Sequence, residues 1–368
     1  MAEHNPTVVD FYCGAGGFTL GAALAGFEPI ASFDWDSDLT STFGHNFPSA
    51  NLVLMDLARA SFEEVLAAIP ARHVTAVIGG PPCQGFSNIG LRDSDDPRND
   101  HVTLFFELVA AVKPMFFVME NVPMVGHSKH SKFLNEALNR LPSCYEVLPF
   151  QILNAADFGA ATNRTRLFIV GRNPGHVDPI MPDVCFPRAA PAWFSVRDAI
   201  VDIPEPFAAS ENDPLPYRNA TTVSEYARKL RAAPPTGLGS TAARVRCDRN
   251  EVTGNSRTVH SSAVRSRFIR IEPGKSDPIS RYPRLDWDRP APVLRAGTGS
   301  DRGSFQAARP IHPDAPRVIS VREAARLQGF PDWFEFASTK WHSHRMIGNS
   351  VPPPLAKSVL EMFRGSCA

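Results

Sequence analysis

The sequence lacks several features that would assign it to a specialised class of protein. Its 368 residues contain no run of about 18 uninterrupted apolar residues, so no membrane-spanning helix is expected. The N-terminal MAEHNPTVVD has no basic region followed by an apolar segment, so no secretion signal is expected either. The six cysteines form no C-x-x-C pair and no zinc-type spacing with histidine. We therefore expect a cytoplasmic protein with free thiols and no metal site.

The chain also lacks net charge, but its charges are unevenly distributed. Basic and acidic residues both number 38, yet residues 1–150 hold 8 basic against 17 acidic residues, so the remainder is positive. Within the remainder, residues 244–270 contain seven arginines and only two acids. This asymmetry indicates that the second half faces a polyanion. A solvated basic surface is the alternative, and charge alone does not separate the two.

Apolar segments and helical patterns alternate in the first half of the chain. Helices are expected at 18–27, 61–69 and 101–112. The buried strands expected around them are 7–12, 29–35, 51–56, 74–79, 115–120, 145–153 and 166–172. Near-continuous apolar strands separated by helices predict an α/β fold with a doubly wound, mostly parallel sheet covered on both faces.

Prolines crowd the sequence after about residue 174, and periodicity is lost there. Helical patterning returns only at 320–330 and 353–363. The intervening region predicts a second, smaller domain that is rich in loops and short strands.

Residues 10–21, DFYCGAGGFTLG, predict a strand, a glycine turn and the start of a helix. The turn lacks the third glycine of G-x-G-x-x-G, which weakens a dinucleotide interpretation. Asp34, Trp35 and Asp56 follow at the carboxyl ends of the next two strands, where doubly wound sheets bind ligands. They suit ribose hydroxyls, an adenine ring and an adenine amino group, so we expect an adenosine-containing ligand. The alternative is that the two acids merely end strands and cap helices.

The segment GGPPCQGFS, residues 79–87, places one cysteine after two prolines. Cys83 follows strand 74–79, and Glu120 follows the next strand after one intervening helix. A right-handed crossover brings both residues to the same edge of the sheet. A partly ionised thiol is a good nucleophile. Taken alone, however, a cysteine is usually a core residue.

Burial beside the apolar strand MFFVM is expected to raise the pKa of the Glu120 carboxyl, which could then protonate a ring nitrogen. Residues 84–100 are polar and contain glycine, as a lid would. Arg164 and Arg166 alternate at the start of a strand and share a face, where they suit an anion or a carbonyl group. A structural salt-bridge pair is the alternative.

Six blocks of the sequence, taken together, resemble the bacterial cytosine-5 DNA methyltransferases, and they stand in the order found in that family. Where many relatives have Gln-x-Arg-x-Arg, this chain has Thr162-Asn163-Arg164-Thr165-Arg166, which keeps both arginines. Residues of about 175–285 match no block and correspond to the family's variable target-recognition region. The six blocks are DFYCGAGGFTLG (10–21), GGPPCQGFS (79–87), ENVP (120–123), NRTRLFIVG (163–171), VREAARLQGFP (321–331) and IGNSVPPPLA (347–356).

The resemblance implies a mechanism and a domain organisation. Residues 1–180 would form the catalytic and S-adenosylmethionine-binding domain, 181–335 the recognition domain, and 336–368 would return to the first. Cys83 would attack carbon 6 of a cytosine flipped out of the duplex. Glu120 would engage nitrogen 3 and the exocyclic amine, and Arg164 and Arg166 would hold the base.

The resemblance also assigns two sets of binding residues. The cofactor pocket would comprise Phe11, Tyr12, Cys13, Gly14, Gly16, Gly17, Phe18, Asp34, Trp35, Asp56, Leu57, Pro82, Leu104, Asn349, Ser350 and Val351. The base pocket and lid would comprise Pro82, Gln84, Gly85, Ser87, Asn121 and Val122.

The implied partner is double-stranded DNA, for a monomeric, nucleoid-associated bacterial enzyme that can belong with a cognate restriction endonuclease. One alternative is an RNA methyltransferase of the tRNA type that uses the same site, although the long variable region favours duplex DNA. A catalytically silent DNA-binding regulator is disfavoured because the chemical residues are intact. The incomplete glycine pattern disfavours a nucleotide-dependent oxidoreductase.

Overall fold

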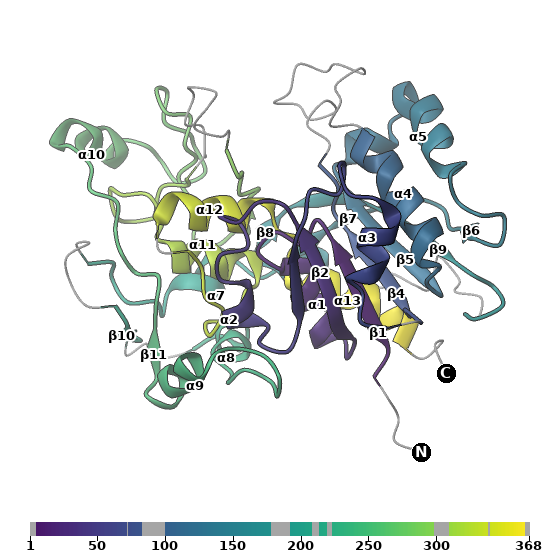
Figure 1. The fold of residues 1–368 in the computed structure, drawn as a ribbon. Coiled ribbons are helices and arrows are strands. Elements are labelled where there is room, and N and C mark those ends of the chain that lie inside the picture. The colour runs from purple at the N-terminus through teal and green to yellow at the C-terminus, as the bar shows by residue number, and fades with distance from the viewer. Residues whose placement is uncertain are drawn as a thin grey trace.

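The computed structural model describes residues 5–71, 73–82, 100–177, 192–207, 213–218, 223–297, 309–337 and 339–364. In these ranges a large sheet covered by helices lies beside a second lobe of short helices and loops (Figure 1). None of the helices described here has both the length and the apolar character needed to cross a membrane.

An eight-stranded sheet organises the first half of the chain. Its order is β3-β2-β1-β4-β5-β9-β6, and β7 also pairs with β9. The order reverses at β1, which places a topological switch point between β1 and β4. The strands are β1 (Thr7–Phe11), β2 (Glu28–Asp34), β3 (Asn51–Leu54), β4 (Ala76–Gly79), β5 (Phe116–Asn121), β6 (Glu146–Val147), β7 (Gln151–Asn154) and β9 (Thr165–Arg172).

The sheet is mostly parallel, as expected, and it contains one reversed strand. The first five strands pair in parallel, whereas β9 runs antiparallel to β5, β6 and β7. The chain passes from β7 to β9 through only a 3-10 turn, η5 (Ala155–Phe158), and the two-residue β8 (Thr162–Asn163). Such a short connection reverses the chain, because a parallel crossover needs a dozen or more residues.

Helices cover both faces of the sheet, because successive strand residues point to opposite sides. On one face α1 (Gly17–Leu24) and α13 (Pro353–Arg364) pack on Val8, Ile78 and Phe116. On the other, α3 (Phe62–Ala67), α4 (Asp100–Val112) and α5 (Ser131–Leu138) share a core with strand residues such as Val77 and Phe117.

The C-terminal helix α13 packs closely on the helix that follows the glycine turn. A Cβ atom on Gly17 would lie 2.5 Å from the Val351 carbonyl oxygen, and one on Gly21 would lie 2.3 Å from the Ala356 Cβ atom. Both glycines are therefore needed for this approach. Figure 1 shows α13, the last helix of the chain, beside α1, near its beginning.

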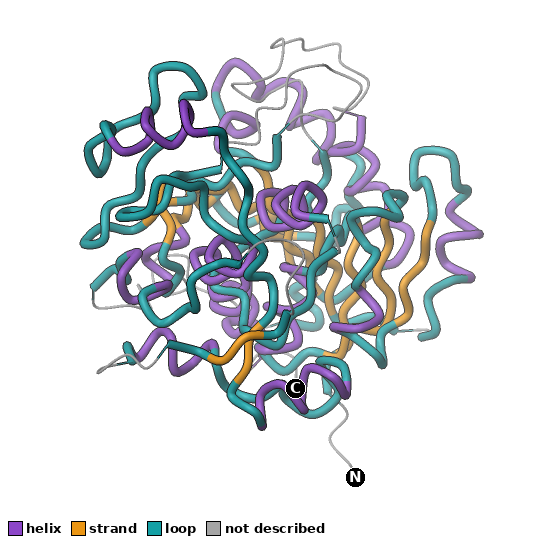
Figure 2. The backbone as a smooth tube through the Cα atoms, turned by 90° about the vertical axis from the view of Figure 1, so that its left-hand side faces the viewer, coloured by secondary structure: helices purple, strands orange, loops and turns teal. Residues whose placement is uncertain are grey.

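The second lobe contains helices that the sequence pattern did not indicate. Figure 2 shows this side as mostly loops joined by short helices. The region expected to be rich in loops and short strands contains four helices in its described part, α7 to α10, while β10, β11 and β12 have two residues each. The remaining elements are α2 (Phe43–Asn46), η3 (Pro123–Gly126), η4 (Ser128–His130), α7 (Val196–Ile200), β10 (Leu215–Pro216), α8 (Glu225–Leu230), α9 (Thr241–Asp248), β11 (Glu251–Val252), α10 (Ser262–Ile269), β12 (Ala291–Pro292), α11 (Val321–Gln328) and α12 (Lys340–Asn349).

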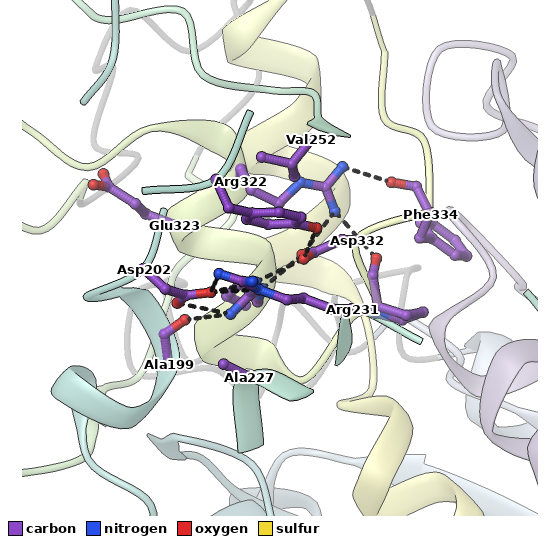
Figure 3. A network of polar contacts seen from close by, with 12 residues as sticks. Ala199, Asp202, Ala227, Arg231, Val252, Arg322, Glu323, Asp332 and Phe334 are labelled. Carbon is purple, nitrogen blue, oxygen red and sulfur yellow. Dashed lines mark hydrogen bonds and ion pairs between the residues drawn. The ribbon is translucent and has the colours of Figure 1, made fainter. Parts of the chain in front are cut away.

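Buried arginines of α11 hold this lobe together (Figure 3). Arg326 pairs with Asp332 at 2.6 Å and with Asp202 at 3.1 Å, and Arg231 reaches the same Asp202 carboxylate. Arg322 donates to the carbonyl oxygens of its neighbours, including that of Phe334 at 3.0 Å. Buried charges are tolerated only when they are paired in this way. The network fixes α11 against α7 and the segment that follows α11.

Candidate active site

The strands that lead to Cys83 and Glu120 are neighbours, as the crossover argument predicted. β4 and β5 pair in parallel, with Gly79 opposite Met119. The Asn121 side-chain amide donates to the Pro81 carbonyl oxygen at 3.2 Å, and a Cβ on Gly80 would lie 3.4 Å from Glu120 Oε2. The backbone that leads into Cys83 therefore passes directly beside the Glu120 carboxyl group.

Several residues predicted for this edge lie outside the described part of the chain. They are Cys83, Gln84, Gly85 and Ser87, together with the rest of the expected lid up to residue 99. Pro82 is described and is half-buried, and Asn121 is buried and Val122 half-buried beside it.

Glu120 is held by Arg166. The Glu120 side chain is 10% exposed, and its Oε1 lies 2.9 Å from Arg166 Nε. Arg166 also donates through Nη1 to the Thr165 carbonyl oxygen at 2.7 Å. This ion pair holds the carboxyl group beside Gly80, and because Oε1 makes no hydrogen bond within the described residues, it can still bind another partner.

Arg164 is a buried cation beside this pair. It is 2% exposed, and its Nη1 donates to the Leu294 carbonyl oxygen at 3.2 Å. Its Nε atom has no hydrogen-bond partner within the described ranges. Burial lowers the pKa of the Arg164 guanidinium well below its usual value; the charge of Arg166 lowers it further, and Glu120 opposes this. A buried, underused donor of this kind favours binding of an oxygen atom or an anion.

The short strand β12 brings the Leu294 segment to this arginine. β12 pairs in parallel with β8, with Ala291 opposite Thr162 and Pro292 opposite Asn163. The segment from the second half of the chain thereby supplies the backbone acceptor for Arg164. Arg166 pairs with Glu120, and the charges of both act on Arg164; the alternation along the strand predicted only that the two arginines share a face.

The glycine turn lies at the switch point, and the Asp34 carboxylate holds it. Gly14 has φ +51°, and its amide donates to Asp34 Oδ2 at 2.8 Å; the Asp36 amide donates to Oδ1 at 2.9 Å. Burial raises the pKa of Asp34 despite these two hydrogen bonds. Trp35, between the two aspartates, is 70% exposed, so its indole face is open to a ligand.

Tyr12 and Asp56 line the same edge, together with a residue that the sequence did not indicate. The Tyr12 hydroxyl lies 3.3 Å from His101 Nδ1, and the rings meet edge to face at 5.5 Å. Burial raises the pKa of Tyr12, and the charges of Asp34 and Asp56 raise it further. Asp56 Oδ1 accepts from the Ala58 amide at 3.1 Å. His101 is 89 residues from Tyr12 in the chain, so no local pattern connects them.

The other residues predicted for the cofactor pocket differ in exposure. Ser350 and Val351 are buried against Gly17 beside the turn, whereas Asn349 is exposed. Leu104 is half-buried. Four more are buried in β1, in the turn or at the start of α1: Phe11, Cys13, Gly16 and Phe18. Leu57, which follows β3, is also buried.

The residues at this edge fit an adenosine-containing group. An exposed indole suits the adenine ring, carboxylates suit hydroxyl and amino groups, and a glycine turn permits close approach of a ligand. A Cβ added to Gly14 would meet no atom of the described chain within 4 Å, so space remains above the turn. Within the described ranges, no group of three or more His, Cys, Asp or Glu side chains is placed to hold a metal ion.

The mixed sheet with reversed β9, and the glycine turn at its switch point, define an S-adenosylmethionine-type methyltransferase fold. The family model for "C-5 cytosine-specific DNA methylase" matches residues 6–364, and the chain belongs to that family. It is a DNA cytosine-5 methyltransferase, and its family and fold imply dependence on S-adenosylmethionine.

Named relatives agree with this assignment. The chain is 41% identical to Type II methyltransferase M.XorII of Xanthomonas oryzae pv. oryzae, covering 96% of this chain and 84% of that one. It is 31% identical to M1.HphI of Haemophilus parahaemolyticus, with coverages of 96% and 86%. A crystal structure described as a prophage-encoded DNA modification methyltransferase from E. coli superposes with a TM-score of 0.85 at 34% identity, covering 98% of this chain and 99% of that one.

Proposed function

We propose that the protein methylates carbon 5 of cytosine within a specific sequence of duplex DNA, and that Cys83 attacks the target base after it has been flipped out of the helix. The observation that carries this proposal is the Glu120–Arg166 ion pair, 2.9 Å long, beside the backbone that leads into Cys83. Such an arrangement offers a base one oriented carboxyl group beside the segment that leads to the proposed nucleophile.

Four side chains have chemical roles in this proposal. The Cys83 thiolate adds to carbon 6 of cytosine, while Glu120 hydrogen-bonds nitrogen 3 and the exocyclic amine. Arg166 holds the carboxyl group in place, and the unfilled donor of Arg164 binds the carbonyl oxygen of the base. S-adenosylmethionine, when bound, supplies an electrophilic methyl group for carbon 5. Water then takes the carbon-5 proton, the electron pair of that bond restores the double bond between carbons 5 and 6, and the bond between sulfur and carbon 6 breaks to give back the thiolate.

The cofactor is held at the switch point. Trp35 would stack on the adenine ring, Asp34 and Asp56 would accept from ribose hydroxyls and the adenine amino group, and the turn around Gly14 would lie against the remainder of the cofactor. Ser350 and Val351 close the pocket from the C-terminal side. The contacts of Asp34 with two backbone amides support this role, because they fix its carboxylate at the edge of the pocket.

The relatives support a proposal for the biological setting. The names of the similar proteins place them among type II methyltransferases, which supports the proposal that this enzyme protects bacterial DNA from a cognate restriction endonuclease. We propose also that it acts as a cytoplasmic monomer. The basic second half would contact DNA phosphates.

The mechanism is tested by methyl transfer from labelled S-adenosylmethionine to duplex DNA and to total RNA. We expect label in DNA only, and Cys83→Ser to abolish transfer while S-adenosylmethionine still binds. Cys144→Ser is the matched control, since Cys144 is an exposed free thiol, and it should retain full activity. Duplex DNA with 5-fluorocytosine at the target should trap a covalent adduct, because no proton is left to eliminate. Turnover by the Cys83 variant, or label in RNA alone, would refute the proposal.

A further inference from the structure

An ion pair joins α12 to the loop that carries Trp35. Arg345 Nη2 lies 2.8 Å from Asp36 Oδ2, and the two side chains are 25% and 11% exposed. The Arg345 guanidinium also lies 5.7 Å from the centroid of the Trp341 ring on the same helix. The pair connects residues 309 positions apart and is more shielded than an ordinary surface salt bridge.

Polar contacts continue from this ion pair to the glycine turn. The other oxygen of Asp36 accepts from the amides of Asp38 and Leu39, both at 3.0 Å. The Asp36 amide donates to Asp34 Oδ1 at 2.9 Å, and Asp34 Oδ2 accepts from the Gly14 amide at 2.8 Å. The backbone is therefore held on both sides of position 35.

Trp35 depends on these backbone contacts for its position. Its side chain is 70% exposed, so packing contributes little to holding it. A large exposed indole samples several rotamers unless its backbone is fixed, and ordering it on binding costs free energy. An ion pair that fixes the neighbouring residue lowers that cost.

Helix α12 also packs against the glycine turn through an apolar side chain. Met346, next to Arg345, packs with Ala15 of the glycine turn and Leu39 of the loop. Just beyond the end of α12, Ser350 and Val351 lie against Gly17. α12 thus contacts this region through apolar groups, through the Arg345–Asp36 ion pair, and through His342, whose Nδ1 lies 3.6 Å from Asp38 Oδ1 of the same loop.

We propose that Arg345 is a positioning residue for the cofactor pocket: through Asp36 it holds the loop on which Trp35 meets the adenine ring. This inference rests on the proposed assignment of that pocket. Arg345 does not touch the reacting atoms, so its loss should weaken cofactor binding and leave the chemical step unchanged at saturating cofactor.

The test measures S-adenosylmethionine affinity of the full-length protein by calorimetry, together with KM, kcat and Tm. For Arg345→Met we expect about a tenfold weaker affinity, as loss of a partly shielded ion pair would give. The kcat value and the KM for DNA should stay within about twofold of the wild-type values. Arg345→Lys keeps the charge and should recover part of the affinity.

A second variant, at Asp36, distinguishes loss of the ion pair from a general loss of stability. Asp36→Asn keeps an oxygen that accepts from the Asp38 and Leu39 amides, but it loses the ion pair. It should weaken binding to a similar degree, and the double variant should be no worse than either single one. Lys357→Met is the matched control, because Lys357 pairs with Glu361 on the exposed side of α13.

Two outcomes would overturn the inference. One is a lower Tm for Arg345→Met with unchanged cofactor affinity, and the other is full additivity of the two variants. Failure of the pocket assignment is separate and visible in Trp35→Ala: if that variant binds S-adenosylmethionine like the wild type, the adenine does not lie on Trp35, whatever the Arg345 variants show.

Discussion

Asp10 is a carboxyl group buried beneath the glycine turn. Thr19 donates to its Oδ2 at 2.6 Å, while Oδ1 and the hydroxyl of the neighbouring Ser32 have no partner within the described residues. Burial raises the pKa of Asp10 to about 8, the charge of Asp34 adds to this, and the Thr19 hydrogen bond opposes it. The folded protein therefore keeps a proton that the unfolded chain releases near its ordinary value of 3.8.

The free energy of unfolding should accordingly fall as pH rises from about 4 to about 8, because the folded state binds more protons than the unfolded state in that window. Asp10→Asn removes this contribution and keeps an acceptor for Thr19, so its stability should depend less steeply on pH. Urea denaturation at several pH values measures the difference. Asp248→Asn, at an exposed carboxylate, should follow the wild-type slope. Parallel curves for Asp10→Asn and the wild type would refute this account.

The types of the site residues and the ends of the strands could be predicted from the sequence, whereas most of the side-chain contacts that these residues make could not. The sequence predicted that the strands leading to Cys83 and Glu120 are neighbours, because a single crossover connects them, and the pairing of β4 with β5 confirms this. No such rule links Tyr12 to His101, or Asp36 to Arg345, because those contacts depend on how distant helices pack. The role assigned to Asp34 stays a prediction; its contacts with backbone amides could not have been foreseen.

At the scale of elements, the packing of α1 on α13 depends on two glycines of α1. A Cβ atom at Gly21 would lie 2.3 Å from the Ala356 Cβ atom and 2.8 Å from the Lys357 amide nitrogen. Alanine favours a helix over glycine by about 1 kcal/mol, but overpacking costs about 1–3 kcal/mol. We expect the second effect to dominate, since the clash involves backbone atoms that cannot rotate away.

Gly21→Ala should therefore lower Tm in thermal denaturation followed by circular dichroism. Gly44→Ala is the matched control, because a Cβ there, in α2, meets no described atom within 4 Å. That variant should be neutral or slightly more stable. A Gly21→Ala protein as stable as the wild type would show that α13 shifts without cost.

The long helices and core strands could be predicted because their apolar periodicity extends over many residues. The short helices α7 to α10 could not be predicted in this way, since five to eight residues contain too few repeats of the apolar pattern. Their local signal was the N-cap: Ser195, Ser224, Ser240 and Ser261 each accept a backbone amide in the first turn. The reversal of β9 was also missed, because strand direction depends on the short connection before it.

At the scale of the whole molecule, the chain makes a sheet, a second lobe, and a return of α13 to the sheet (Figure 1). The domain boundaries at 180 and 335 stay predictions. Part of the positive charge of the second half lies on α10, which is far from the sheet, at the end of the second lobe (Figure 1). Arg265 and Arg270, on α10 and at its C-cap, are exposed, while Arg267 is paired with Asp277 at 2.7 Å.

The exposed arginines of α10 should contribute phosphate contacts if this lobe binds DNA. Neutralising a cation that contacts a phosphate lowers the slope of log affinity against log salt concentration by about 0.9. Replacing both Arg265 and Arg270 by alanine should therefore weaken DNA binding at low salt and lower that slope by about 2. The S-adenosylmethionine affinity and kcat at saturating DNA should not change, because both residues lie outside the proposed pocket.

Fluorescence anisotropy with a labelled duplex at several salt concentrations measures this slope. Lys132→Ala is a suitable control, since Lys132 on α5 is exposed and lies on the opposite side of the molecule from α10. Equal slopes for the double variant and the wild type would place the phosphate contacts elsewhere. The paired Arg267 provides a graded comparison: its charge is already offset by Asp277, so Arg267→Ala should reduce the slope less than either exposed arginine does.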